Sequence, residues 1–221
     1  TLKDATGCHV TAVTMGPPPA EGMLRELLAM GADDAILISA REFGGSDTFA
    51  TSQIIAAAIT YTGLSDEDMI FCGRQAIDGD TAQVGPQLAE KLDIPQISYA
   101  AEIIKEGNEV TVKRMLEDGY MMIKQQTPCL VTCISDQDKK ARMMSLEGIN
   151  AAYKKPYTVL DFEALKDEPL IELDKIGLKG SPTNIFVSFT PPLKGIGTML
   201  EGADKKTTDT LASMLLEKHV I

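Results

Sequence analysis

Tryptophan is absent from this chain, and aromatic residues make up only 5% of its 221 residues. Such a composition offers no evident platform on which the bases of a single-stranded nucleic acid would stack. Basic residues are also in short supply, because 32 acidic residues against 21 basic ones give a formal net charge of −11. This charge repels phosphates and anionic lipid, so we expect no nucleic acid and no anionic membrane surface as a partner.

Long apolar runs are missing as well. No run approaches the roughly 18 residues that a membrane-spanning helix needs, and the first residues show no signal-peptide pattern. We therefore expect no membrane insertion and a cytoplasmic location.

Histidine and cysteine are scarce. The two histidines, His9 and His219, have no evident nucleophile and acid beside them in the sequence, so we expect no catalytic residue of a hydrolase. Cys129 and Cys133 do not have the spacing of a zinc site. With Cys8 and Cys72 they are expected to be buried, reduced thiols, and we expect no metal site. Whether the chain is an enzyme stays open at this point.

What is present is an alternation of strand-like and helix-like segments. Apolar content of 44% suffices for one sizeable domain with an appendage. Alternation at this spacing predicts an α/β fold, a parallel sheet with crossover helices of the Rossmann-like type. The predicted strands are 8–14, 35–39 and 68–72, and the predicted helices are 20–30, 47–62 and 83–92.

An antiparallel addition follows this alternation. Residues 108–115 and 120–126 alternate with period two around Glu117-Asp118-Gly119, which predicts a hairpin. An extended run at 96–105 precedes the hairpin, and a last strand at 130–134 follows it.

The character of the chain shifts after residue 155. Residues 176–194 are rich in Gly, Pro and Ser, and only a short edge strand at 184–189 and a final helix at 207–218 are predicted there. Thr207 or Thr208 is the expected cap of that helix. We therefore divide the chain into an α/β domain, residues 1–155, and a C-terminal arm, residues 156–221.

The start of the chain has the character of a helix end. Residues 2–7 resemble a last helical turn closed by Gly7, and the chain begins at Thr1 without a methionine. We expect the native protein to carry a further N-terminal segment.

The most informative stretch is Gly73 to Pro86, GRQAIDGDTAQVGP, between a predicted strand and a predicted helix. Nucleotides bind at such strand ends in α/β sheets, and free N–H groups at a helix N-terminus attract anions. Gly73 and Gly79 allow close backbone approach, and Asp80 or Thr81 is the expected helix cap. An ordinary, well-capped turn explains the composition equally well.

Two other loops follow predicted strands. Met15-Gly16-Pro17 is explained by a tight strand–helix connection, and Asp47 or Thr48 by the capping of the next helix. The alternative for the second loop is that threonine hydroxyls and helix amides hold a phosphate.

A basic stretch, Lys139 to Arg142, precedes apolar residues at helical spacing. By spacing alone these residues indicate an amphipathic helix that packs on its own core. Methionine-rich faces also suit adaptable partner surfaces. The apolar residues are Met143, Met144, Leu146, Ile149 and Tyr153.

Two motifs resemble one known family. The pattern G-[KR]-Q-A-I-D-x-D-x-x-Q-x-G at Gly73 to Gly85, and Arg114-Met115-Leu116-Glu117-Asp118-Gly119 with Ile123 and Pro128 to Thr132, resemble the beta subunit of electron-transfer flavoproteins. Met121 departs from the Glu or Gln usual in the family. The resemblance runs nearly end to end.

Three segments resemble the electron-bifurcating branch of that family. They are Val13-Thr14-Met15-Gly16-Pro17, Asp47-Thr48-Phe49-Ala50-Thr51 and Arg142-x-Met144-Ser145-Leu146-x-Gly148-Ile149. In the non-bifurcating branch a Cys-Gly-Pro turn contacts AMP instead.

The resemblance implies a function. The chain would form a heterodimer with an alpha subunit, bind FAD and accept hydride from NADH. It would pass one electron to an acyl-CoA dehydrogenase through a second FAD in the alpha subunit, and the other to ferredoxin or flavodoxin. The alternatives are a non-bifurcating beta subunit with structural AMP, and a non-redox adenine-nucleotide sensor or scaffold.

The resemblance also implies a set of residues. The C-terminal arm would wrap the alpha subunit, and Met143, Met144, Leu146 and Ile149 would dock the dehydrogenase. The implied cofactor contacts are Met15, Gly16, Asp47, Thr48, Thr51, Gly73, Arg74, Gln75, Ala76, Ile77, Asp78, Gly79, Asp80, Thr81, Ala82, Gln83 and Val84.

Overall fold

The computed structural model describes residues 2–134, 142–193, 195 and 197–220. They form two compact units, Thr1–Asn184 and Ile185–Ile221. The sequence placed this division at 155/156, but residues 156–184 belong with the first unit. Three of their apolar side chains, Leu160, Leu165 and Ile176, are buried in its core.

The first unit contains a three-stranded parallel sheet with the order β1-β2-β8. Strand β8 was not predicted. The helices that precede β2 are α1 (Leu2–Thr6), the 3-10 turn η1 (Pro18–Ala20) and α2 (Glu21–Ala29). The strands are β1 (Thr11–Met15), β2 (Asp34–Ile38) and β8 (Thr158–Leu160).

A second, five-stranded sheet has the order β3-β7-β4-β5-β6. β4 pairs with β7 in parallel and with β5 in antiparallel orientation, so it joins the parallel part to the predicted hairpin. The predicted α/β class with an antiparallel addition is confirmed. The strands are β3 (Met69–Gly73), β4 (Gln96–Glu106), β5 (Glu109–Leu116), β6 (Gly119–Gln126) and β7 (Cys129–Cys133).

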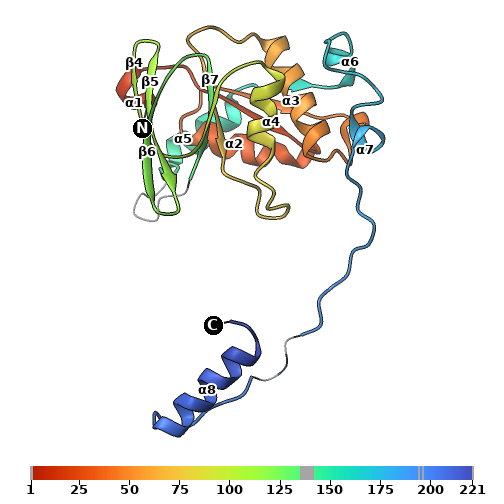
Figure 1. Cartoon of the computed structure of the whole chain (residues 1–221). Coiled ribbons are helices and arrows are strands. Elements are labelled where there is room, and N and C mark those ends of the chain that lie inside the picture. Colours follow the sequence, from red (N-terminus) through yellow and green to blue (C-terminus); the bar gives the residue numbers. More distant parts are fainter. Residues whose placement is uncertain (1, 135–141, 194, 196, 221) are drawn as a thin grey trace. The chain divides into compact units, whose positions relative to one another are not determined.

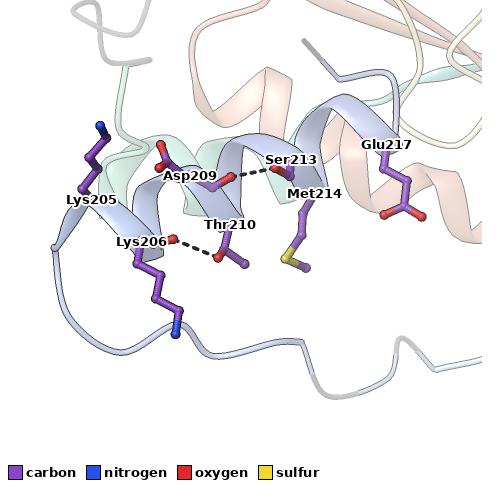
Figure 2. A pocket seen from close by; sticks show the side chains of 7 residues that line it. All are labelled: Lys205, Lys206, Asp209, Thr210, Ser213, Met214 and Glu217. Atoms are coloured by element: carbon purple, nitrogen blue, oxygen red, sulfur yellow. Dashed lines mark hydrogen bonds between the residues drawn. The ribbon is translucent and has the colours of Figure 1, made fainter.

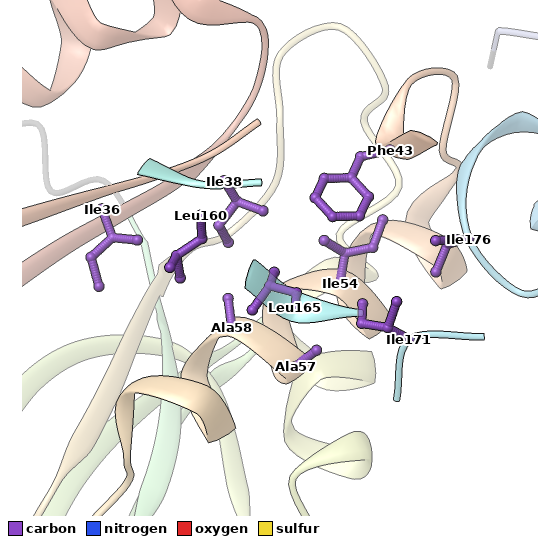
Figure 3. Close-up of a cluster of buried hydrophobic side chains, with 10 residues drawn as sticks. All are labelled: Ile36, Ile38, Phe43, Ile54, Ala57, Ala58, Leu160, Leu165, Ile171 and Ile176. Atoms are coloured by element: carbon purple, nitrogen blue, oxygen red, sulfur yellow. The ribbon is translucent and has the colours of Figure 1, made fainter. Parts of the chain in front are cut away.

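Helix α3 (Thr48–Thr62) packs against both sheets. Its Ile54, Ala57 and Ala58 lie in a core cluster with β2 and β8 (Figure 3), while its Ala56 packs with Leu130 of β7 and with α4 (Val84–Lys91). In Figure 1 the hairpin strands lie on one side of β7, and α3 and α4 lie on the other. Each fully buried Leu or Ile contributes about 1.5–3 kcal/mol to folding, and through these residues α3 belongs to the cores of both sheets.

The remaining elements correct several expectations. Residues 184–189 form no strand, and the last helix, α8 (Lys205–Glu217), is capped by Asp204, which accepts a hydrogen bond from the Thr207 backbone at 2.8 Å. Part of the predicted basic stretch, 139–141, lies outside the described residues. The other elements are η2 (Arg41–Phe43), α5 (Leu146–Lys154), α6 (Phe162–Leu165) and α7 (Gly177–Gly180).

The cysteines are only partly as expected. All four thiols are free, and burial raises the pKa of Cys72 to about 11, with a smaller contribution from Cys133. Cys8, however, is exposed, because β1 begins only at Thr11.

Candidate functional site

A pocket of about 700 Å³ lies where β1 and β2 end. The carboxyl ends of parallel strands are the usual location of ligand sites in α/β folds. Its lining combines apolar side chains with hydroxyls and one guanidinium. The lining residues are Met15, Gly16, Pro17, Pro18, Ile38, Ser39, Ala40, Arg41, Phe43, Gly44, Gly45, Ser46 and Thr51.

The turn after β1 forms one side of the pocket. The Gly16 N–H donates to the Ile38 carbonyl at 3.0 Å, which ties the turn to the end of β2. A side chain at Gly16 would come within 3.1 Å of the Ala20 Cβ, so the close approach favours glycine. The structure thus places Met15 and Gly16, both predicted cofactor contacts, at the pocket.

A further part of the lining comes from residues 41–48, which we call the pocket wall. Phe43 is buried and packs edge-to-face on Phe162, with ring centroids 6.4 Å apart. The Ser46 hydroxyl donates to the Phe43 carbonyl at 2.7 Å. Within the described residues, the exposed Arg41 guanidinium has no hydrogen-bond or ion-pair partner, so it is available to an anion.

Asp47 caps helix α3, as predicted. Its Oδ1 accepts the Ala50 N–H at 3.0 Å, and its Oδ2 accepts the Thr183 N–H at 2.8 Å. Burial raises the pKa of this carboxyl, but the hydrogen bonds from Ala50 and Thr183 outweigh it and hold the pKa below its ordinary value of 3.8. The carboxylate is thus engaged by the protein, and the positive end of the α3 dipole faces the same region.

The 73–83 loop is exposed along its length, with only Ala82 half-buried. Asp80 and Ala82 adopt left-handed backbone conformations, with φ of 53° and 54°, and the Gln75 amide donates to the Asp80 carboxylate. The predicted capping of α4 by Asp80 or Thr81 is wrong, because these turns separate both residues from the helix. Gln83 is the N-cap and makes no side-chain cap bond.

One hydrogen bond joins the two segments. The Thr48 hydroxyl donates to Gln83 Oε1 at 3.0 Å. Of the predicted cofactor residues, Met15, Gly16 and Thr51 line the pocket, whereas Asp47, Thr48 and residues 73–84 do not line it.

Three polar lining residues were missed by the sequence reasoning: Ser39, Arg41 and Ser46. They belong to no motif that the sequence singled out. The rule that ligand sites follow parallel strands would have found them, because Ser39 directly follows β2.

The predicted docking residues surround the start of α5. Met143, Met144 and Leu146 are exposed, with 86% of Leu146 accessible, while Ile149 is half-buried. A side chain at Gly148 would come within 2.5 Å of the Ala29 carbonyl, so α5 lies very close to the end of α2.

Arg25 of α2 fixes the other end of α5. Its Nη1 donates to the carbonyls of Ala152 at 2.7 Å and Lys155 at 2.6 Å, the last acceptors of the helix. Its guanidinium lies 4.9 Å from the centre of the Tyr157 ring. Basic side chains at a helix C-terminus satisfy free carbonyls and the dipole, so both ends of α5 are held while its outer face stays exposed.

A second hollow, of about 620 Å³, lies along α8 in the second unit (Figure 2). All of its lining residues belong to this one helix. Side chains of a single helix cannot enclose a ligand, and we assign no site to it. Its lining residues are Lys205, Lys206, Asp209, Thr210, Ser213, Met214 and Glu217.

Two kinds of feature are absent from the described residues. No helix there is long and apolar enough to cross a membrane. In the same part of the chain, no three His, Cys, Asp or Glu side chains come together as a set of metal ligands.

Comparison with known proteins gives a consistent result. Residues 1–165 match the family model described as electron transfer flavoprotein domain. The chain is 73% identical over 220 residues to the acryloyl-CoA reductase electron transfer subunit gamma of Anaerotignum propionicum. That match covers 100% of this chain and 82% of the relative.

Two further relatives match over the same extent. The caffeyl-CoA reductase-Etf complex subunit CarD of Acetobacterium woodii is 46% identical over 222 residues. The electron transfer flavoprotein subunit beta of Thermoanaerobacterium thermosaccharolyticum is 43% identical over 221 residues. Each match covers 100% of this chain and 82% of the relative.

Proposed function

The chain belongs to the electron transfer flavoprotein family, among the beta subunits, and we propose that it works in a bifurcating heterodimer. It holds FAD in the pocket at the ends of β1 and β2 and takes a hydride from NADH. Of the two electrons, one leaves toward an acyl-CoA dehydrogenase through FAD of the alpha subunit. The other leaves toward ferredoxin or flavodoxin.

The pocket is the observation that carries this proposal. Its volume of about 700 Å³ lies within the roughly 300–1,000 Å³ of small-molecule and cofactor sites. Met15, Ile38 and Phe43 offer apolar surface, and the Arg41 guanidinium offers positive charge. This combination suits a ligand with both an aromatic ring and phosphates.

The residues of the chain would bind and orient the cofactor. When bound, FAD supplies the chemistry itself, accepting two electrons as hydride and releasing them singly. Arg41 would balance phosphate charge, while the Thr51 hydroxyl would offer a donor and an acceptor. Met15 and Gly16 would contact the ring, and residues 73–84 of the adjacent loop would hold the adenosine and pyrophosphate.

The proposed partners follow from the relatives and from the exposed surface. Two relatives carry the names of acryloyl-CoA and caffeyl-CoA reductases, which supports a partner of the acyl-CoA dehydrogenase type. Met143, Met144, Leu146 and Ile149 dock it, and the C-terminal arm contacts the alpha subunit. We place the complex in the cytoplasm, where reduced cysteines such as these four are usual.

Nucleotide extraction from the purified heterodimer tests the cofactor. We expect two FAD and no AMP per heterodimer, and reduction of the bound flavin by NADH. One FAD with one AMP would show a non-bifurcating electron carrier instead. Isolation of the chain with a nucleotide but without an alpha subunit would favour a non-redox sensor.

A substitution tests the docking surface. Leu146→Ala removes an exposed anchor, and we expect electron transfer to the dehydrogenase to fall about tenfold. NADH-dependent reduction of an artificial dye is expected to stay unchanged. Leu173→Ala, at another exposed leucine of the first unit, is the matched control. Equal dehydrogenase rates in the two variants would place the docking surface elsewhere.

A further inference from the structure

The last described part of the first unit is fastened to the pocket wall. We call residues 176–184 the arm root, because the second unit begins at Ile185. The Leu178 N–H donates to the Gly44 carbonyl at 3.0 Å, and the Gly177 N–H donates to the Ser46 hydroxyl at 3.1 Å. Both acceptors belong to residues that line the pocket.

Ser181 is at the centre of this contact. It is buried, with only 6% of its surface accessible. Its hydroxyl accepts the Asp47 N–H at 2.8 Å and donates to the Gly177 carbonyl at 2.7 Å. Two residues further on, the Thr183 N–H donates a hydrogen bond to Asp47 Oδ2 at 2.8 Å.

The backbones of the two segments touch as well. Gly177 has a φ of 63°, and a Cβ there would lie 2.2 Å from the Glu42 carbonyl oxygen. On the other side, a Cβ at Gly45 would lie 3.0 Å from Cβ of Leu178. No room separates the wall from the root, so a shift of one moves the other.

We propose that Ser181 is a positioning residue of the pocket, which couples ligand occupancy to the root of the C-terminal arm. Ser181 lies 134 residues from Asp47 in the sequence and does not line the pocket. It acts by holding the wall that Arg41, Ser46 and the start of α3 present to a ligand. The proposal rests on the proposed function, because it takes a nucleotide as the occupant.

Reciprocity gives the proposal a second consequence. If the root holds the wall in its binding conformation, a ligand on the wall must stabilise the root by the same factor. The chain leaves the first unit directly after the root, toward apolar residues such as Ile185 and Phe186 that are exposed in the arm. Occupancy of the pocket therefore restrains the point from which the arm departs.

The test uses the full chain in its heterodimer, with AMP and FAD as separate probes. Ser181→Ala is compared with Ser52→Ala, a buried serine whose hydroxyl donates only to the Phe49 carbonyl within its own helix. Loss of one buried hydrogen-bond centre is expected to raise the Kd of the bound probe about fivefold in Ser181→Ala. Ser52→Ala and Ser181→Thr, which keeps the hydroxyl, are expected to stay within about twofold of the parent.

Hydrogen exchange of the unmodified heterodimer provides a readout that needs no variant. The probe is expected to slow exchange of the Asp47, Gly177 and Thr183 amides, and Ser181→Ala is expected to remove the effect at Gly177 and Thr183. The coupling is overturned if Ser181→Ala leaves the Kd unchanged, or if the probe does not slow exchange of the arm-root amides. Either result counts even if the variant is less stable. A heterodimer in which neither probe protects residues 39–46 overturns the proposed function together with it.

Discussion

Two segments carry the candidate site, and the chain supports them very differently. The pocket wall, residues 41–48, has hydrogen-bond partners in α3 and in the arm root. The 73–83 loop is exposed, and within the described residues its links to the rest of the fold include the Thr48–Gln83 hydrogen bond and the Arg74 guanidinium 5.5 Å from the centre of the Tyr99 ring. The more specific sequence motif therefore belongs to the less supported segment.

The two segments therefore contribute to ligand binding in different ways. A preformed wall fixes the shape of a pocket before a ligand arrives, and it costs little ordering on binding. A loop with few contacts belongs to the less stable part of a protein. We therefore expect its motif to act through the ligand or the partner subunit rather than through folding. We expect substitutions in the wall to change stability, and substitutions in the loop to change affinity alone.

The largest contrast is between two glycines. Gly177→Ala places a Cβ against the Glu42 carbonyl oxygen at a left-handed position, and we expect a loss of about 3 kcal/mol or more in unfolding free energy. Gly79→Ala meets no atom within 4 Å and is expected to change it by less than about 0.5 kcal/mol. Urea unfolding measures both, and equal losses would remove the distinction between the loop and the wall with its arm root.

Two aspartates give a smaller contrast. Asp47→Ala removes the α3 cap and the acceptor for Thr183, and we expect a loss of about 1–2 kcal/mol. Asp78→Ala, in the exposed loop, is expected to leave unfolding unchanged while it weakens nucleotide binding. A measurable loss of stability in Asp78→Ala would mean that the loop is packed more firmly than its exposure indicates.

Stability in acid provides a third test, at Asp47. The pKa of Asp47 is held below its ordinary value of 3.8, so its ionised form stabilises the fold fully above that value. The contribution is lost as the pH falls through the lower folded pKa. The stability difference between the parent and Asp47→Ala should therefore shrink between about pH 5 and about pH 2, measured by urea titrations. A difference that stays constant over this range would show that the charge on Asp47 is not what holds the root.

The smallest expected effect concerns the bond between the segments. Thr48→Val and Gln83→Ala, alone and together, form a double-mutant cycle around one exposed hydrogen bond. We expect a coupling of about 0.5 kcal/mol in nucleotide binding, measured by calorimetry. Strict additivity of the two single changes would mean that wall and loop act independently.

Much of the fold was predictable because hydrophobic periodicity and caps are local signals. The α3 helix was expected to open at Asp47 or Thr48, and it begins at Thr48 with Asp47 as its cap. Strand β8 was missed because three residues, Thr158 to Leu160, carry no period. Residues 184–189 were expected to form a short edge strand, yet their sequence says nothing about where a hydrogen-bonding partner is, and the described residues supply none.

The site was harder to predict than the fold. Motifs drew attention to residues 73–84, while Arg41 and Ser46 line the pocket without any motif. Asp80 and Thr81 had the chemistry of helix caps, but the left-handed turns at Asp80 and Ala82 displace both from the helix start. Backbone conformation of this kind depends on the surrounding structure, so side-chain type alone did not reveal it.

The exposed apolar residues of the arm also bear on how much of the subunit accumulates in the cell. Ile185, Phe186, Val187 and Phe189 are mostly accessible in this chain, and short apolar segments of this kind are recognised as aggregation hazards. A subunit made in excess would therefore present a signal to chaperones and proteases until another chain covers it. The abundance of the subunit would follow the supply of its partner, so correct stoichiometry would need no dedicated regulator.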